Sequence, residues 1–218
     1  MSLIPDIWPE GLRIRSAHRD DAPCIVILHG LGAANDDFSG VADFIDPQSQ
    51  WRWVFPNAPE RPVTLNGGRR MRAWFDIFGL DARSPEDAVG LAAMATRIMA
   101  LLDHEAAQGV PVILGGFSQG GAMSLYTAFH AGYQSAAVLA LSAYLPLRQQ
   151  LPKVQQAAPI FWGHGRSDSI LPLAYMEIAQ EIMEPLGYTL STHIYPMDHQ
   201  ICEAELVDLR QFLQVILA

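Results

Sequence analysis

Uninterrupted runs of apolar residues recur along the chain, separated by longer stretches in which apolar residues return every three or four positions. Such a run predicts a strand that is buried on both faces, as in a parallel sheet. Residues 12–17 instead alternate apolar with polar side chains and predict an exposed edge strand. The runs predict strands at residues 24–28, 112–114, 136–141 and 159–163, and further strands are expected at residues 51–55 and 190–195.

Between these runs, the three-to-four-residue periodicity predicts helices. Asp36 or Asp37 is expected to cap a helix that runs through residues 41–45. A long helix is expected to open at residues 85–87 and to end near residue 108. Its predicted apolar side consists of Val89, Ala92, Ala93, Ile98, Leu101 and Leu102. Further helices are expected directly after Ser118 and at residues 173–186 and 203–217.

Strands that alternate with helices indicate an α/β fold, with a doubly wound, mostly parallel sheet flanked by helices on both faces. Such sheets place their chemistry at the carboxyl ends of the strands. The length of 218 residues fits one domain over residues 1–218, and no repeat or linker divides it. No apolar run is as long as a membrane span, so we expect no stable membrane insertion.

The net charge is −9, because 23 acidic residues outnumber 14 basic ones. This balance argues against nucleic acid or an anionic membrane as a partner that is held by charge. The two cysteines, Cys24 and Cys202, have neither a disulfide pattern nor metal-ligand spacing. No secretory signal is visible at the start of the sequence, so we expect a cytoplasmic location.

The stretch of residues 60–85 lacks periodicity but is rich in large apolar side chains. Loops of this length are usually functional or disordered, and disorder fits poorly with so many aromatic residues. We expect part of this stretch to cover a site and to line an apolar pocket. Simple packing against the core is the alternative, above all for Trp74 and Phe75.

The strongest chemical signal is a Gly-x-Ser-x-Gly turn between the strand that ends near Leu114 and the following helix. A serine in this turn, Ser118, has a strained backbone, and the chain folds back closely only if Gly116 and Gly120 carry no Cβ. Ser118 is then a nucleophile, and the N–H of Gln119 at the helix start is half of an oxyanion hole. A purely structural glycine-rich turn is the alternative.

A second glycine-rich turn, at residues 29–32, follows the first buried strand. Its glycines allow the N–H of Leu31 to face a ligand, as the second oxyanion donor does in serine hydrolases of this fold. His29 precedes the nucleophile and stands at the strand end. We therefore expect it to make structural hydrogen bonds rather than to act as a base.

Four histidines follow Ser118 in the sequence, and in this fold the base is the last member of the order serine, acid, histidine. His130 lies more than two turns away on the same helix, and His193 lies inside a predicted strand. His164 stands at a strand end and remains a competitor. His199 directly follows the last predicted strand and is the preferred base.

Among the carboxylates between Ser118 and His199, three glutamates are spaced as on a solvated helix face. Asp198 adjoins His199, and adjacent side chains on an extended turn diverge. Asp168 follows a buried strand and is the preferred acid. Zinc bound by His164, Asp168 and His199 is a minor alternative, because a hydrolytic zinc site does not need the Gly-x-Ser-x-Gly turn. We expect no metal and no cofactor.

Several segments along nearly the whole chain resemble the phospholipase/carboxylesterase family, which includes acyl-protein thioesterases. They are HGLG at 29–32, FPNAP at 55–59, PVTLNGG at 62–68, WFDI at 74–77, GFSQGGA at 116–122, LSAYLP at 141–146, GHG at 163–165 with Asp168, and His199. The resemblance implies an α/β-hydrolase with the triad Ser118, Asp168 and His199. It also implies oxyanion donors at Leu31 and Gln119, an acyl channel shaped by residues 65–74, and a homodimer.

We therefore predict a serine hydrolase that cleaves carboxylic esters or thioesters of short to medium acyl chains through an acyl-enzyme. The partner is a small-molecule ester or thioester, with an acylated protein or a lysophospholipid as further possibilities. The substrate pocket is expected to include Leu65, Trp74, Phe75, Leu171 and Met197. The alternatives are a lysophospholipase, a long-chain acyl-protein thioesterase, and a hydrolase-fold protein that binds a ligand without turnover. The basic group Arg69, Arg70 and Arg72 is a departure from the family pattern.

Overall fold

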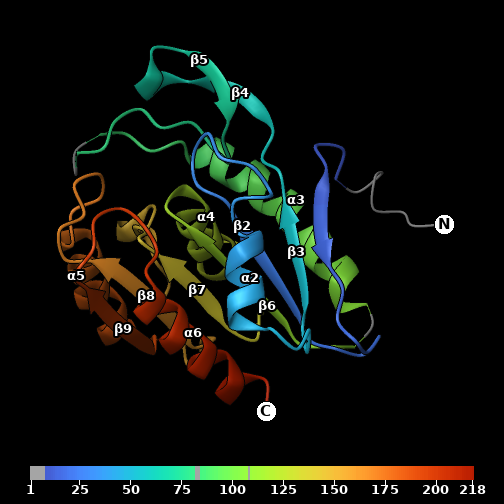
Figure 1. Cartoon of the computed structure of the whole chain (residues 1–218). Coiled ribbons are helices and arrows are strands. Elements are labelled where there is room, and N and C mark those ends of the chain that lie inside the picture. Colours follow the sequence, from blue (N-terminus) through green and yellow to red (C-terminus); the bar gives the residue numbers. More distant parts are fainter. Residues whose placement is uncertain (1–7, 82–83, 108) are drawn as a thin grey trace.

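A seven-stranded sheet forms the centre of the computed structural model, which describes residues 8–81, 84–107 and 109–218 (Figure 1). Its strand order is β1-β3-β2-β6-β7-β8-β9, and every neighbouring pair is parallel except β1 with β3. The mostly parallel, doubly wound sheet is therefore confirmed. The strands are β1 (Leu12–Arg15), β2 (Cys24–Leu28), β3 (Arg52–Pro56), β6 (Val112–Phe117), β7 (Val138–Leu141), β8 (Ile160–Gly165) and β9 (Leu190–Tyr195).

Helices cover both faces of this sheet. In Figure 1, α2 (Ser39–Ile45) and α6 (Glu203–Ile216) lie in front of it, and α3 (Ala88–Ala106) and α4 (Gln119–Phe129) lie behind it. The helix α5 (Ala174–Met183) packs with α4 against β7 and β8. Alternate residues of β2 enter the two apolar layers, because successive side chains of a strand point to opposite faces. No helix in the described part of the chain is both long and apolar enough to cross a membrane.

One prediction about the helices is wrong, and a second is right only for Ile98, Leu101 and Leu102. The helix α2 begins at Ser39 with Phe38 as its N-cap and no side-chain cap, so neither Asp36 nor Asp37 caps it. On α3, Val89 is 82% exposed. Ala92 and Ala93 are exposed as well. The buried side of α3 consists of Leu91, Met94, Ala95, Ile98, Leu101, Leu102 and Glu105, and the packing of α3 against α4, β2 and β6 selects this side.

The stretch of residues 60–85 is more regular than its sequence indicated. It opens with an antiparallel hairpin of β4 (Glu60–Val63) and β5 (Arg69–Arg72), joined through the 3-10 turn Thr64–Asn66. Figure 1 shows this hairpin standing apart from the main sheet. Four-residue strands rich in arginine carry little hydrophobic periodicity, so the sequence pattern could not reveal them.

A buried glutamate lies against strand β8. Glu205 is fully buried in the first turn of α6, and a Cβ built on Gly163 of β8 would lie 1.9 Å from its Oε1. Burial raises the pKa of the Glu205 carboxyl from 4.5 to about 8, and the backbone N–H of Cys202 offsets this only in part. The folded protein therefore holds a proton here at neutral pH.

We expect Glu205→Gln to stabilise the protein progressively as the pH rises from 5 to 8. The unfolded chain releases this proton near pH 4.5 and the folded chain near pH 8, so wild-type stability falls between these values. Glutamine cannot titrate, so the variant lacks this loss of stability. The difference between the folded and unfolded pKa values of Glu205 corresponds to a free energy of unfolding on the order of a few kcal/mol. Melting temperatures of both proteins at pH 5, 6, 7 and 8 should diverge. Glu203→Gln, in the same turn but exposed, is the control, and parallel melting curves for Glu205→Gln would contradict the assignment.

Candidate active site

The turn between β6 and α4 holds Ser118 in an unusual backbone conformation. Its φ is 54° and its ψ is −117°, a region that residues with side chains rarely occupy. A Cβ on Gly116 would lie 2.4 Å from the carbonyl carbon of Gly120, and one on Gly120 would lie 2.1 Å from the carbonyl oxygen of Leu28. The close approach that the sequence predicted for these two glycines is confirmed. The turn therefore presents the Ser118 hydroxyl at the carboxyl end of β6.

Three side chains from three strand ends form a continuous hydrogen-bonded row. The Oγ of Ser118 lies 2.9 Å from Nε2 of His199, and Nδ1 of His199 lies 2.8 Å from Oδ2 of Asp168. Asp168 follows β8 and His199 follows β9. The other carboxylate oxygen of Asp168 accepts the N–H groups of Ile170 and Leu171 at 3.0 and 2.7 Å, which fixes its orientation. The structure thus brings together the three residues that the sequence selected.

The remaining histidines near this end of the sheet make structural contacts. His29 accepts the N–H of Ala58 through Nε2 at 3.0 Å, and its Nδ1 lies 2.7 Å from the carbonyl of Gly30. Burial lowers the pKa of His29, so the ring stays neutral at physiological pH. The expected structural role of His29 is confirmed.

His164, the competing base, is fully buried in β8. Its Nε2 lies 2.8 Å from the carbonyl oxygen of Leu171, and burial lowers its pKa. Nε2 of His130 lies 3.0 Å from the Pro146 carbonyl instead of near Ser118. Within residues 8–81, 84–107 and 109–218, no group of three His, Cys, Asp or Glu side chains is arranged to hold a metal ion.

Two backbone amides lie beside Ser118. Gln119 is the first residue of α4, and an N–H in the first turn of a helix has no acceptor within that helix. Leu31 lies in the turn after β2, where a Cβ built on the neighbouring Gly30 would come within 3.7 Å of the Ser118 Cβ. Leu31 and Gln119 line the same cavity as Ser118 and His199. Their positions suit amides that bind a developing negative charge.

Residues 9–217, almost the entire chain, match the family model described as phospholipase/carboxylesterase. The chain belongs to this family. Membership makes it a hydrolase and confirms both the resemblance seen in the sequence and the α/β-hydrolase fold. Proteins that are similar to it include an acyl-protein thioesterase 1 of Neurospora crassa and another of Mycosarcoma maydis. The first is 32% identical over 87% of this chain and 84% of its own length, and the second is 35% identical over 88% and 90%.

Solved structures show the same similarity. Acyl-protein thioesterase 2 of Zea mays superposes with a TM-score of 0.86 at 24% identity, covering 95% of this chain and 99% of its own. SOBER1 of Arabidopsis thaliana superposes with a TM-score of 0.82 at 28% identity, covering 90% of this chain and 100% of its own. Esterase PE8 superposes with a TM-score of 0.77 at 28% identity, covering 94% of this chain and 98% of its own.

An apolar cavity of about 560 Å³ opens beside Ser118. Leu65 and Leu171 line it, as predicted. Ile77 and Leu80, from the stretch expected to line an apolar pocket, line it as well. The sequence did not indicate several further lining residues, because they come from segments far apart in the chain. They are Phe38, Val41, Phe117, Tyr144, Ile170 and Ile201.

The predictions that Trp74, Phe75 and Met197 line this cavity are wrong. Trp74 is fully buried and packs in the core layer of α3 and α4, where its indole N–H donates to the carbonyl of His29 at 2.8 Å. Phe75 is buried in the same layer and borders a neighbouring cavity instead. Met197 is buried within the loop that carries His199, and its carbonyl accepts the N–H of Ser167.

The side-chain amide of Gln119 makes two buried hydrogen bonds that the sequence did not indicate. Its Oε1 accepts the N–H of Trp74 at 3.0 Å, and its Nε2 donates to the carbonyl of Phe75 at 2.8 Å. A single buried amide therefore ties the segment after the β4–β5 hairpin to the turn that carries Ser118.

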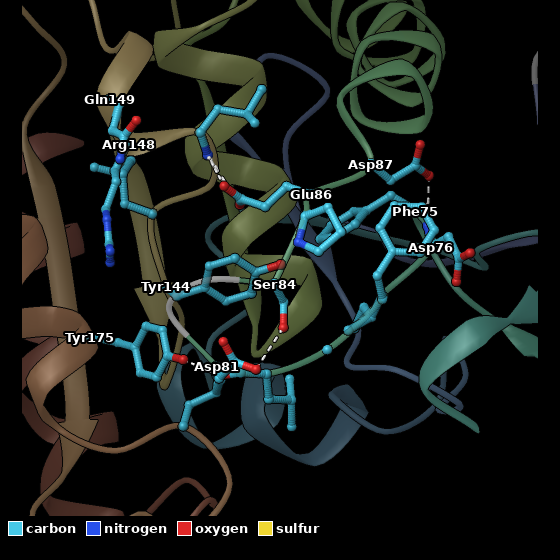
Figure 2. A pocket seen from close by; sticks show the side chains of 18 of the residues that line it. Phe75, Asp76, Asp81, Ser84, Glu86, Asp87, Tyr144, Arg148, Gln149 and Tyr175 are labelled. Atoms are coloured by element: carbon cyan, nitrogen blue, oxygen red, sulfur yellow. Dashed lines mark hydrogen bonds between the residues drawn. The ribbon is translucent and has the colours of Figure 1, made fainter. Parts of the chain in front are cut away.

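A second, more polar cavity of about 490 Å³ adjoins the first, and Figure 2 shows it from close by. Tyr144 and Tyr175 meet edge to face on its wall, with their ring centroids 6.2 Å apart. The carboxylate of Glu86 accepts the N–H of Leu147 at 3.1 Å. Burial raises the pKa of the Glu86 carboxyl above its usual range. Four residues line both cavities and form the wall between them: Ile77, Leu80, Tyr144 and Leu171.

Proposed function

We propose that this protein is a serine esterase or thioesterase that acts on short to medium acyl chains through an acyl-enzyme. The observation that carries the proposal is the row from Ser118 through His199 to Asp168, which opens directly into an apolar cavity. A nucleophile bonded to a base, with the base held by a carboxylate, is the arrangement that acyl transfer requires.

Each member of the row has a defined role in this proposal. The Oγ of Ser118 attacks the acyl carbonyl while Nε2 of His199 takes its proton, and His199 then returns the proton to the leaving alcohol or thiol. Asp168 holds the imidazole in the tautomer that presents Nε2 to Ser118 and stabilises the imidazolium. Water then attacks the acyl-enzyme by the same route, with His199 again as the base.

The amides of Leu31 and Gln119 form the oxyanion hole in this proposal. The carbonyl oxygen becomes negative as Ser118 attacks, and the donors that meet it there lower the energy of the transition state more than that of the bound ester. The loss of one such donor typically costs on the order of 10²–10³ in rate. Leu65 and Leu171 contact the acyl chain in the cavity.

A long-chain acyl-protein thioesterase is the second candidate, because the similar curated proteins carry the name acyl-protein thioesterase. An apolar pocket discriminates by only about 1–3 kcal/mol per methylene, so several chain lengths should react. One domain over residues 1–218, a cytoplasmic location and a homodimer remain predictions from the sequence.

The test is kcat/KM for p-nitrophenyl esters from acetyl to palmitoyl, beside thioesters of the same acyl groups. We expect the maximum at a short or medium chain. A maximum at palmitoyl would transfer the assignment to a long-chain thioesterase or a lysophospholipase. Absence of turnover with every ester and thioester would overturn the proposal and favour a protein that binds its ligand without reaction.

A further inference from the structure

The loops that follow β8 and β9 are in direct backbone contact. We name residues 165–170 the acid loop, because it carries Asp168, and residues 196–200 the base loop, because it carries His199. A Cβ built on Gly165 would lie 2.4 Å from the carbonyl oxygen of Asp198, so only a glycine allows this approach. The relative position of the two loops therefore sets the position of the two side chains.

Asp198 joins these loops through its side chain. Its Oδ1 accepts three hydrogen bonds: from the N–H of Ser169 at 2.7 Å, from the Oγ of Ser169 at 2.9 Å and from the N–H of His199 at 2.8 Å. Its Oδ2 lies 3.2 Å from the same serine hydroxyl. The bonds from Ser169 and His199 hold the pKa of this carboxyl below its usual range, so it is ionised at neutral pH.

The Asp198 carboxylate bonds Ser169 and the backbone of His199, and it does not bond the side chains of Ser118, His199 and Asp168 that form the row. Ser169 directly follows Asp168, and His199 is bonded through its backbone rather than its ring. Both Asp198 and Ser169 are exposed, so apolar burial does not explain why they are paired. Hydrogen bonds at an exposed site contribute little to global stability, yet a small displacement of a catalytic group is costly for rate.

We infer that Asp198 is a positioning residue: its carboxylate ties the acid loop to the base loop and thereby holds Asp168 and His199 at their hydrogen-bonding distance. The inference rests on the proposed function of this site. Asp198 touches neither the imidazole nor the cavity, so it acts through the two residues that it holds.

Asp198→Ala is expected to lower kcat for the best p-nitrophenyl ester about tenfold and to leave KM within about twofold, because the cavity is unchanged. Asp198→Asn keeps an oxygen that accepts both backbone N–H groups, and it should retain kcat within about twofold. Ser169→Ala removes only the hydroxyl bonds and should cost about twofold to threefold. In the Asp198→Ala background, Ser169→Ala should add nothing, since the two residues act as one unit.

Asp103→Ala, which removes an exposed aspartate on α3, is the matched control and should leave kcat unchanged. The inference is overturned if Asp198→Ala keeps wild-type kcat, or if Asp198→Asn is as slow as Asp198→Ala. If Asp198→Ala does not fold, as judged by its melting temperature, Ser169→Ala provides the test. A lower kcat of Ser169→Ala supports the inference, and an unchanged kcat overturns it. Ser118→Ala in the same assay distinguishes a failure of this inference from a failure of the proposed function. Turnover that does not depend on Ser118 would contradict the proposed function itself.

Discussion

Ser118→Ala is expected to reduce kcat/KM for p-nitrophenyl esters by at least about 10⁴-fold, the scale seen when a hydrolase loses its nucleophile. No other hydroxyl replaces it, because the Oγ of Ser118 is the atom that lies 2.9 Å from Nε2 of His199. The residual rate would come from binding and from the amides of Leu31 and Gln119. Steady-state kinetics with freshly purified protein provides the measurement.

The Ser118 variant should fold normally, because alanine keeps the Cβ of this half-buried residue and the hydrogen bond that is lost is the one to His199. Ser191→Ala is the matched control: its hydroxyl pairs with His193 on β9, outside the cavity, and it should keep full activity. More than a few per cent of wild-type turnover in Ser118→Ala would exclude Ser118 as the nucleophile.

Gly120→Ala is expected to lower the free energy of unfolding by about 3 kcal/mol or more, at the upper end of what overpacking costs. Its Cβ would lie 2.1 Å from the carbonyl oxygen of Leu28 and 2.6 Å from that of His29. These atoms are backbone, so β2 or α4 must move. Urea denaturation followed by circular dichroism measures the loss.

Gly40→Ala is the matched control for Gly120→Ala, since both glycines are helical but a Cβ on Gly40 meets nothing within 4 Å. It should be neutral or stabilising by up to about 1 kcal/mol, because alanine loses less entropy in a helix. Activity should fall in Gly120→Ala as well, because β2 leads into the turn that holds Leu31. Equal stability of wild type and Gly120→Ala would show that the close approach is not rigid.

The clamp formed by Asp198 and Ser169 illustrates what a sequence pattern does and does not contain. Side-chain divergence at adjacent positions correctly indicated that Asp198 does not orient the imidazole of its neighbour. No local pattern indicates that its carboxylate reaches the N–H and hydroxyl of Ser169, because that contact exists only once β8 and β9 lie side by side.

The parallel sheet, the Ser118 turn and the choice of Asp168 and His199 could all be predicted from the amino-acid sequence. These features follow from short-range rules: buried strands are continuous apolar runs, glycines mark close approach, and strand ends converge at one edge. Tertiary packing decided which face of α3 is buried, that residues 60–72 form a hairpin, and that Trp74 lies in the core rather than in the cavity. Contacts between elements distant in the chain select among conformations that the local pattern leaves nearly equal in energy.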